Sequence, residues 1–354
     1  MLYRENGQFK NNYRSDQQML PILQDRLFML ALVGIAFLVV PFVVSDYVFL
    51  SLFIPFLILA LAAIGLNLLV GYCGQISIGH AAFMAVGAYA AYNLALRVPQ
   101  LNFLVVLVLA GLIAAAAGMV FGIPSLRIKG LYLAVATLAA QFFMDWLFAR
   151  VKWFTNYAHS GSVSTAPVEM FGWRIAAPVE KYLFLLAILI VFTVIAKNLV
   201  RSHIGRSWMA MRDMDVAAEV IGIRPVYAKL TAFAVSSFYV GVAGALWGFV
   251  HLGSWEPLAF SLTLSLNLLF MIIIGGMGSL LGSYFGAAFI VVLPILLNQI
   301  PLWLGIPIST SMASHLEFMI FGALIVFFLI VEPHGLARLW AIGKEKLRLW
   351  PFPH

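Results

Sequence analysis

The sequence predicts an all-α polytopic membrane protein with about ten transmembrane helices. Hydrophobic residues make up 63% of the chain and charged residues only 10%. A soluble domain has about 25% charged residues, so a chain this poor in charge cannot cover a water-facing surface. Ten apolar stretches approach the roughly 20 residues that a spanning helix needs. The basic residues between them are strongly biased to one side of the membrane.

The spans are expected in order along the chain. The first 20 residues are polar, and residues 1–26 are predicted to be an uncleaved cytoplasmic tail, because no small-residue cleavage site follows the first apolar run. A transmembrane domain over 27–337 and a cytoplasmic tail over 338–354 follow. The predicted spans are 27–49, 50–70, 76–96, 101–123, 130–149, 182–200, 229–251, 259–275, 280–298 and 315–332. Glycine-rich joints near 71–79 and 275–282 are the places where a helix could be broken or re-entrant.

The charges between the spans predict the orientation. With a cytoplasmic N-terminus, 16 of the 21 Lys and Arg residues lie on the cytoplasmic side. The outer side carries only Arg97, Arg150, Lys152, Arg174 and Lys181. Because Lys and Arg are enriched in cytoplasmic loops, both termini are predicted to be cytoplasmic. The same assignment gives a periplasmic loop over 150–181 and a cytoplasmic segment over 201–228.

Charge and cysteine content exclude several classes of function. The net charge of +7 could indicate a nucleic-acid partner, but the basic residues lie between apolar spans, so membrane orientation explains them and no nucleic acid is expected. The single cysteine, Cys73, excludes an intramolecular disulfide framework and a metal site built from several cysteines.

Polar residues within the spans are the candidates for a solute path. A polar group in hydrocarbon costs free energy unless it is satisfied, so such residues should face the protein interior or a water-filled passage. The glycine-rich stretch from Gly71 to Phe83 holds three of them, and the alternative for each is helix packing. The predicted path residues are Asn67, Gln75, Ser77, His80, Thr137, Gln141 and Asn267.

The cytoplasmic stretch 205–223 is predicted to be a helix that ends at Gly222, with Pro225 just beyond it. Trp208, Met211, Ala218 and Ile221 can share one apolar stripe. Such a helix could pass the motion of a partner protein to the adjoining spans. The apolar stripe would then fill a groove on the partner, and Arg212, Asp215 and Glu219 would form charge pairs at its rim. The alternative is a solvated helix or one that lies on the membrane surface.

A second glycine-rich stretch places Gly278, Gly282 and Gly286 on one helix face, which predicts close helix packing. No Walker A sequence is present, and neither are the motifs His-Glu-x-x-His and Gly-x-Ser-x-Gly. No acidic residue lies near the centre of a predicted span, which argues against a proton- or sodium-coupled carrier.

Several long motifs, in order, resemble one family. They are Gly65–Tyr89, Arg127–Leu138, Gly205–Gly222, Pro257 with Phe260, Ile274–Ala288 and Glu332–Leu336. Together they are similar to the LivM-type permease of branched-chain amino-acid ABC importers. The stretch 156–163 departs from the glycine-rich loop of that family, and related systems handle urea, amides or aromatic acids.

The resemblance implies a permease subunit of the bacterial inner membrane that carries out no covalent chemistry. It implies a second, related permease subunit, two cytoplasmic ATPase subunits and a periplasmic binding protein as partners, within a lipid membrane. No cofactor is expected on this chain, since ATP and Mg²⁺ would bind the ATPase subunits. The residues implied in coupling to the ATPase are Arg206, Trp208, Met211, Arg212, Asp215, Ala217, Ala218, Glu219 and Gly222. An autonomous carrier or channel is the main alternative, and a membrane enzyme is the third.

Overall fold

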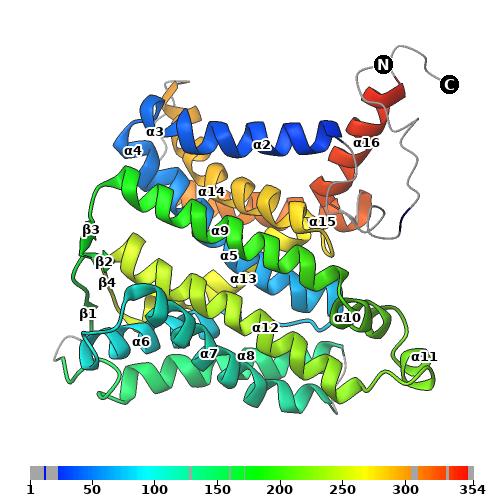
Figure 1. The fold of residues 1–354 in the computed structure, drawn as a ribbon, viewed down its shortest axis with the longest axis horizontal. Coiled ribbons are helices and arrows are strands. Elements are labelled where there is room, and N and C mark those ends of the chain that lie inside the picture. Colours follow the sequence, from blue (N-terminus) through cyan, green and yellow to red (C-terminus); the bar gives the residue numbers. More distant parts are fainter. Residues whose placement is uncertain are drawn as a thin grey trace.

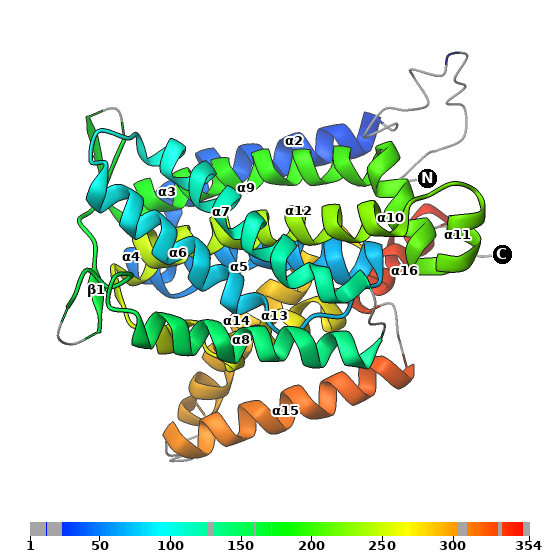
Figure 2. The ribbon, with the colours of Figure 1, turned by 90° about the horizontal axis from the view of Figure 1, so that it is seen from below.

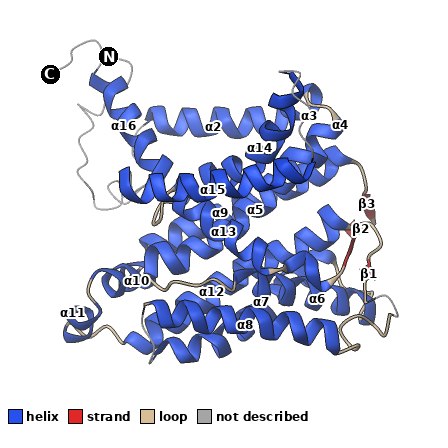
Figure 3. Ribbon diagram, turned by 180° about the vertical axis from the view of Figure 1, so that it is seen from behind, coloured by secondary structure: helices blue, strands red, loops and turns tan. Residues whose placement is uncertain are grey.

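The computed structural model describes residues 12, 23–126, 130–158, 161–170, 172–303, 310–331 and 335–349. Its long helices lie side by side in one bundle (Figure 1). Short strands lie at one end of the bundle, called here the strand end, and α11 lies at the other, called here the α11 end (Figures 1 and 2). Figure 3 shows that helix dominates the described chain, which confirms the all-α class.

A helix corresponds to each of the ten predicted spans. Eight helical segments are long and apolar enough to cross a membrane, and α6 and α15 complete the set. The long helices are α2 (Leu23–Leu38), α5 (Ile54–Asn67), α6 (His80–Arg97), α7 (Phe103–Gly122), α8 (Leu131–Arg150), α9 (Pro178–Arg201), α12 (Pro225–Leu246), α13 (Leu262–Gly275), α14 (Leu280–Trp303) and α15 (Thr310–Val331). The turns η1 (Phe49–Phe53), η2 (Leu68–Tyr72) and η4 (Trp247–Leu252) extend α5 and α12.

The predicted boundary between the first two spans is wrong. A single span over 27–49 was expected, but α2 and the short α3 (Val40–Val43) end before Val44. The next helical run begins with α4 (Asp46–Val48) and continues through η1 into α5. Ser45 has the extended backbone of an N-cap residue, and Asp46 places an acidic side chain in the first turn. Both are ordinary signals of a helix start.

Both glycine-rich joints are breaks between helices. The first break is the non-helical stretch 74–79 between η2 and α6, and the second break is 276–279 between α13 and α14. Gly74, Gly276 and Gly278 have positive φ angles of 71°, 123° and 76°, a conformation that favours glycine. The prediction of broken helices at these joints is therefore confirmed.

The centre of the bundle is formed by α6 and α12, packed backbone to backbone. A Cβ atom on Gly87 of α6 would lie 2.0 Å from the carbonyl oxygen of Gly241 on α12. A Cβ atom on Gly244 would lie 2.0 Å from the carbonyl oxygen of Met84. Gly282 and Gly286 bring α14 close to α13, as the glycine stripe predicts, but Gly278 lies in the second break and not on the helix. Because these helices are surrounded by protein, α6 can be less apolar than a lipid-facing span.

The loop 150–181 is folded against the bundle. Its strand β1 (Val163–Ser164) pairs with β4 (Ser254–Trp255), which follows η4, and β2 (Val168–Met170) pairs with β3 (Trp173–Ile175). Val163, Val168 and Ile175 are buried, whereas Tyr157 and Trp173 are exposed. These two-stranded sheets are a small addition to the predicted all-α architecture.

The α11 end holds α10 (His203–Asp213), α11 (Asp215–Val220) and α16 (Gly335–Leu349) (Figures 1 and 2). The predicted C-terminal tail is helical over most of its length, and Lys344 of α16 pairs with Asp25 of α2 at 3.0 Å. Parts of several predicted segments lie outside the described residues, namely 1–11 and 13–22 of the N-terminal tail, 127–129, 159–160, 171, 332–334 and 350–354.

Candidate functional site

The first break ends inside the protein, where α6 begins, and side chains of two other helices satisfy its backbone. The amide of Ile78 donates to Thr137 Oγ1 of α8 at 3.0 Å. The amide of Ala81 donates to Ser265 Oγ of α13 at 2.8 Å, and that of Ala82 donates to Gln141 Oε1 of α8 at 2.7 Å. The first amides of a helix have no partner within the helix, so these three side chains act as caps from outside.

His80, the first residue of α6, joins the break to α12. Its Nδ1 lies 2.7 Å from Ser77 Oγ, and its Nε2 lies 2.8 Å from Ser236 Oγ of α12. A neutral imidazole has one donor and one acceptor nitrogen, and both are used here. All three side chains are buried. A ring with both nitrogens engaged is suited to bracing the break and not to acting as a general base.

Gln141 is the centre of the polar cluster at the first break. Besides accepting from Ala82, its Oε1 accepts from Ser265 Oγ at 2.9 Å. Its Nε2 donates to the carbonyl oxygen of Phe260 at 2.8 Å and to Asp145 Oδ1 at 3.0 Å. Asp145 also lines a cavity of about 350 Å³ together with Glu256 and Ser261. One buried amide thus connects α6, α8, α13 and the wall of that cavity.

The second break is held by Asn67 of α5. Its Oδ1 accepts from the amide of Gly278 at 2.8 Å. Its Nδ2 donates to the carbonyl oxygen of Ser279 at 2.8 Å and to Ser283 Oγ at 2.9 Å. The second break also packs against η2, just before the first break, because a Cβ atom on Gly71 would lie 2.2 Å from the amide nitrogen of Gly278. One side chain therefore joins the first broken helix to the start of the second.

The structure brings most of the predicted path residues together at these two breaks. Ser77, His80, Thr137 and Gln141 meet at the first break, whereas Asn67 lies at the second. Gln75 lies in the first break, half-buried, with a single long contact of 3.5 Å to the carbonyl oxygen of Cys73. Asn267 differs, because its Oδ1 is buried and has no hydrogen-bond partner among the described residues.

The sequence analysis missed three serines of these networks, Ser236, Ser265 and Ser283. All three are buried, in α12, α13 and α14. The signal that could have identified them is a hydroxyl group within a predicted span. This signal is weak, because serine is small enough to pack in any glycine- and alanine-rich helix.

The stretch 205–223 is not the single helix that was predicted. An extended residue, Met214 (φ −155°, ψ 99°), separates α10 from α11. The predicted end at Gly222 is confirmed, since Gly222 has a φ of 90° and the amide of Ile223 donates to the carbonyl oxygen of Ala218.

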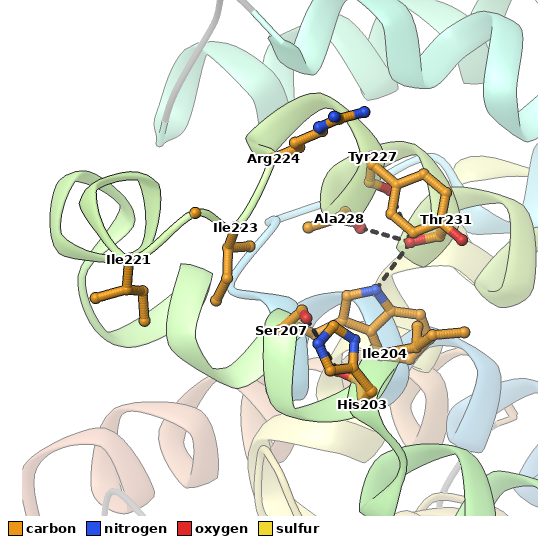
Figure 4. A pocket seen from close by; sticks show the side chains of 11 residues that line it. His203, Ile204, Ser207, Ile221, Ile223, Arg224, Tyr227, Ala228 and Thr231 are labelled. Atoms are coloured by element: carbon orange, nitrogen blue, oxygen red, sulfur yellow. Dashed lines mark hydrogen bonds between the residues drawn. The ribbon is translucent and has the colours of Figure 1, made fainter.

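Three of the four residues of the predicted apolar stripe face inward, and the fourth, Ile221, is exposed. Trp208, Met211 and Ala218 are buried, so the expectation that their side chains fill a groove on a partner is wrong. Trp208 Nε1 donates to Thr231 Oγ1 of α12 at 3.1 Å beside a cavity of about 270 Å³ (Figure 4). Thr231 in turn donates to the carbonyl oxygen of Ala228 in α12 at 3.0 Å. These contacts tie α10 to α12.

A different apolar surface is exposed at this end. Met214, Val216, Val220 and Ile221 have exposed fractions of 71%, 69%, 83% and 73%. Figures 1 and 2 show α11 projecting past the ends of the long helices. We call these four residues the α11 tip.

The charged and small residues predicted for coupling occupy separate positions. Arg206 donates to the carbonyl oxygen of Arg201 at 3.1 Å, and Asp215 accepts from the amide of Val216 at 2.9 Å. Ala217 and Glu219 are exposed on α11. Arg212 does not lie at an outer rim as expected, because its Nη1 donates inward to the carbonyl oxygen of Gly71 at 2.9 Å.

Comparison with known proteins assigns the family. Residues 48–329 match the model of the branched-chain amino acid transport system permease component. The chain is 29% identical over 339 residues to the high-affinity branched-chain amino acid transport system permease protein LivM of Salmonella typhimurium, covering 89% of this chain and 75% of that protein. The LivM protein of Escherichia coli is also 29% identical, over 344 residues, with the same coverage.

A more distant relative is the probable branched-chain amino acid transport permease protein LivM of Methanocaldococcus jannaschii. It is 22% identical over 316 residues, which cover 78% of this chain and 89% of that protein. No solved structure matches the chain significantly. The bundle of apolar helices and the family match over most of its length lead to one conclusion: the chain is an integral membrane protein that belongs to the family of branched-chain amino acid transport permease components.

Proposed function

We propose that this chain is the permease subunit of an ATP-driven importer that takes up branched-chain amino acids or a related small polar solute, such as urea, an amide or an aromatic acid. The family match over residues 48–329 is the observation that carries this proposal. The chain has no Walker A sequence of its own. The work for transport therefore comes from partner subunits.

The proposed complex contains a second, related permease, two cytoplasmic ATPases and a periplasmic binding protein. The α11 end faces the cytoplasm in this proposal, because the Lys and Arg bias assigns 201–228 to that side. The strand end then faces the binding protein, which supplies the solute. Alternating access moves the solute past the helix breaks, where irregular backbone and buried polar groups gather inside the protein.

The α11 tip is the proposed docking surface for one ATPase. Four aliphatic side chains exposed on a projection into water are costly unless a partner covers them. The projection is rigidly attached, since the buried Trp208 and Met211 anchor α10 to the bundle. Motion of the ATPase would therefore be passed to α10 and on to α12.

An aspartate at the α11 tip tests this assignment. Val220→Asp should abolish copurification of the ATPase with the permease, because it buries a charge in an apolar contact. Val98→Asp is the matched control, since Val98 is an exposed valine at the strand end. Ala218→Arg is less informative, because Ala218 is buried and an arginine there would disturb the chain itself.

The copurification experiment also separates the rival functions. An autonomous carrier would accumulate solute in liposomes without any ATPase. Uptake by the purified chain alone would contradict the proposed function. Full ATPase association in Val220→Asp would contradict the docking surface.

A further inference from the structure

Arg212 links the α11 end to both helix breaks. Its Nη1 donates to the carbonyl oxygen of Gly71 at 2.9 Å, at the end of η2 just before the first break. A Cβ atom on Gly278, in the second break, would lie 3.2 Å from the same Nη1. A Cβ atom on Gly74 would lie 3.0 Å from Arg212 Cγ. The guanidinium thus reaches from α10 into the place where the two breaks meet.

The orientation of this guanidinium is fixed by its neighbour. Arg212 Nε donates to Asp213 Oδ1 at 2.9 Å, and Nη2 lies 2.9 Å from the same oxygen. The Arg212 side chain is 37% exposed, so water screens the ion pair and its own contribution to stability is small. The pair serves mainly to aim Nη1 at the Gly71 carbonyl oxygen.

Both breaks are anchored beyond the point that Arg212 reaches. Asn67 ties the amide of Gly278 to α5, next to Gly71. The far end of the first break is held by Thr137 and Ser265, on α8 and α13. The stretch 74–79 is therefore attached to α10 at one end and to the buried polar cluster at the other. It is a short non-helical piece of chain whose first two amides, of Gly74 and Gln75, donate to the carbonyl oxygens of Val70 and Leu69 in η2, so a displacement of α10 changes the path of the residues that follow.

We propose that Arg212 is the positioning residue that transmits the movement of α10 to the two helix breaks during solute transport. This inference rests on the proposed function, in which an ATPase moves α10 and α11. It assigns to Arg212 a role inside the permease, distinct from contact with the ATPase at the α11 tip. The conformation of the breaks then follows the nucleotide state of the complex through this one guanidinium.

The test separates transmission from assembly. In a Cys73→Ser background, Ile76→Cys places a single thiol in the first break, at a residue that is 36% exposed. The rate of maleimide labelling is measured with the ATPase nucleotide-free and trapped with ATP and vanadate. The wild-type rate should differ between the two states. In Arg212→Gln this difference should vanish, and solute uptake per ATP hydrolysed should fall about tenfold, the scale expected for one lost charge-assisted hydrogen bond.

Two further variants make the result decisive. Arg224→Gln removes the same charge from an exposed arginine at the start of α12 and should behave as wild type. Arg212→Lys keeps one donor for Gly71 but loses the two-pronged contact with Asp213, so its uptake per ATP should be intermediate. If the Arg212→Gln complex does not assemble, the Arg212→Lys complex is the test. Solute uptake per ATP hydrolysed by Arg212→Lys equal to that of the wild type would then overturn the inference.

Other outcomes distinguish this inference from the proposed function. Nucleotide-dependent labelling that persists in an assembled Arg212→Gln complex would overturn the role of Arg212 alone. Wild-type labelling that ignores the nucleotide, while uptake still requires ATP, would show that the first break does not move and would also refute the inference. Absence of any ATPase partner for the wild-type chain would refute the proposed function itself.

Discussion

Replacing Gln141 by leucine should destabilise the bundle strongly although the two side chains have similar size. The substitution removes the acceptor of the Ala82 amide and the donor to the Phe260 carbonyl oxygen, and both bonds are buried. A buried polar group left without a partner costs about 1–3 kcal/mol. Two such backbone groups therefore predict a loss of about 2–6 kcal/mol, to which Ser265 adds because it loses the same acceptor.

The assay for Gln141→Leu is the thermal melting of the detergent-solubilised protein, followed by size-exclusion chromatography. A loss of this size should lower the melting temperature by roughly 3–8 °C for a chain of 354 residues. Phe142→Leu is the matched control, because Phe142 is the next residue of α8 and is 56% exposed, so its shortening should shift the melting temperature little. A melting temperature of Gln141→Leu equal to that of Phe142→Leu would refute the view that Gln141 caps α6.

Three other substitutions test separate parts of the molecule. Asn267→Leu should keep the melting temperature or raise it, because Asn267 Oδ1 lacks a partner among the described residues. If this oxygen contacts the solute, the same substitution lowers the uptake of radiolabelled solute, and unchanged uptake would exclude that role. Gly87→Leu should abolish folded protein on size-exclusion chromatography, since even a Cβ would lie 2.0 Å from a backbone oxygen of α12. A Cβ on Gly34 in α2 would meet no atom within 4 Å, so Gly34→Leu should be tolerated. Trp173→Ala, at a side chain that is 68% exposed at the strand end, should lower the stimulation of ATP hydrolysis by the binding protein several-fold without changing basal hydrolysis; equal stimulation would place the binding-protein contact elsewhere.

Local sequence signals were sufficient for the long helices and the two glycine-rich breaks, but not for the interruption at Met214. A run of apolar residues defines a span without reference to its neighbours, and a helix stops at a glycine that adopts a positive φ, as at Gly222 and Gly276. The end of the first span was missed by a few residues because the hydrophobic pattern runs through Val44 and Ser45 without a clear interruption.

The direction of each side chain could not be predicted in the same way. Trp208 and Ala218 were predicted on one stripe of a single helix, but they lie on separate helices, α10 and α11, and periodicity does not say whether an apolar face packs against the chain's own helices or a partner. Arg212 was expected at an outer rim for the same reason. The carbonyl oxygen that draws it inward belongs to Gly71, 141 residues away in the sequence, so no local pattern indicates the contact. The polar residues of the breaks could be predicted because an unsatisfied polar group in hydrocarbon costs free energy. Their hydrogen-bond partners lie on other helices, so no local sequence pattern indicates them.

The caps on α6 have a consequence for how the chain is made. Ser265, which caps the amide of Ala81, follows it by 184 residues. At a synthesis rate of about 5–20 residues per second, Ser265 is made roughly 10–40 s after the start of α6. Throughout that interval the amide of Ala81 would lack its cap in lipid, and the composition of α6 is too polar to favour lipid strongly. Nascent α6 must therefore wait beside the insertion machinery, or in contact with water, and enter the bundle only with the helices that follow it.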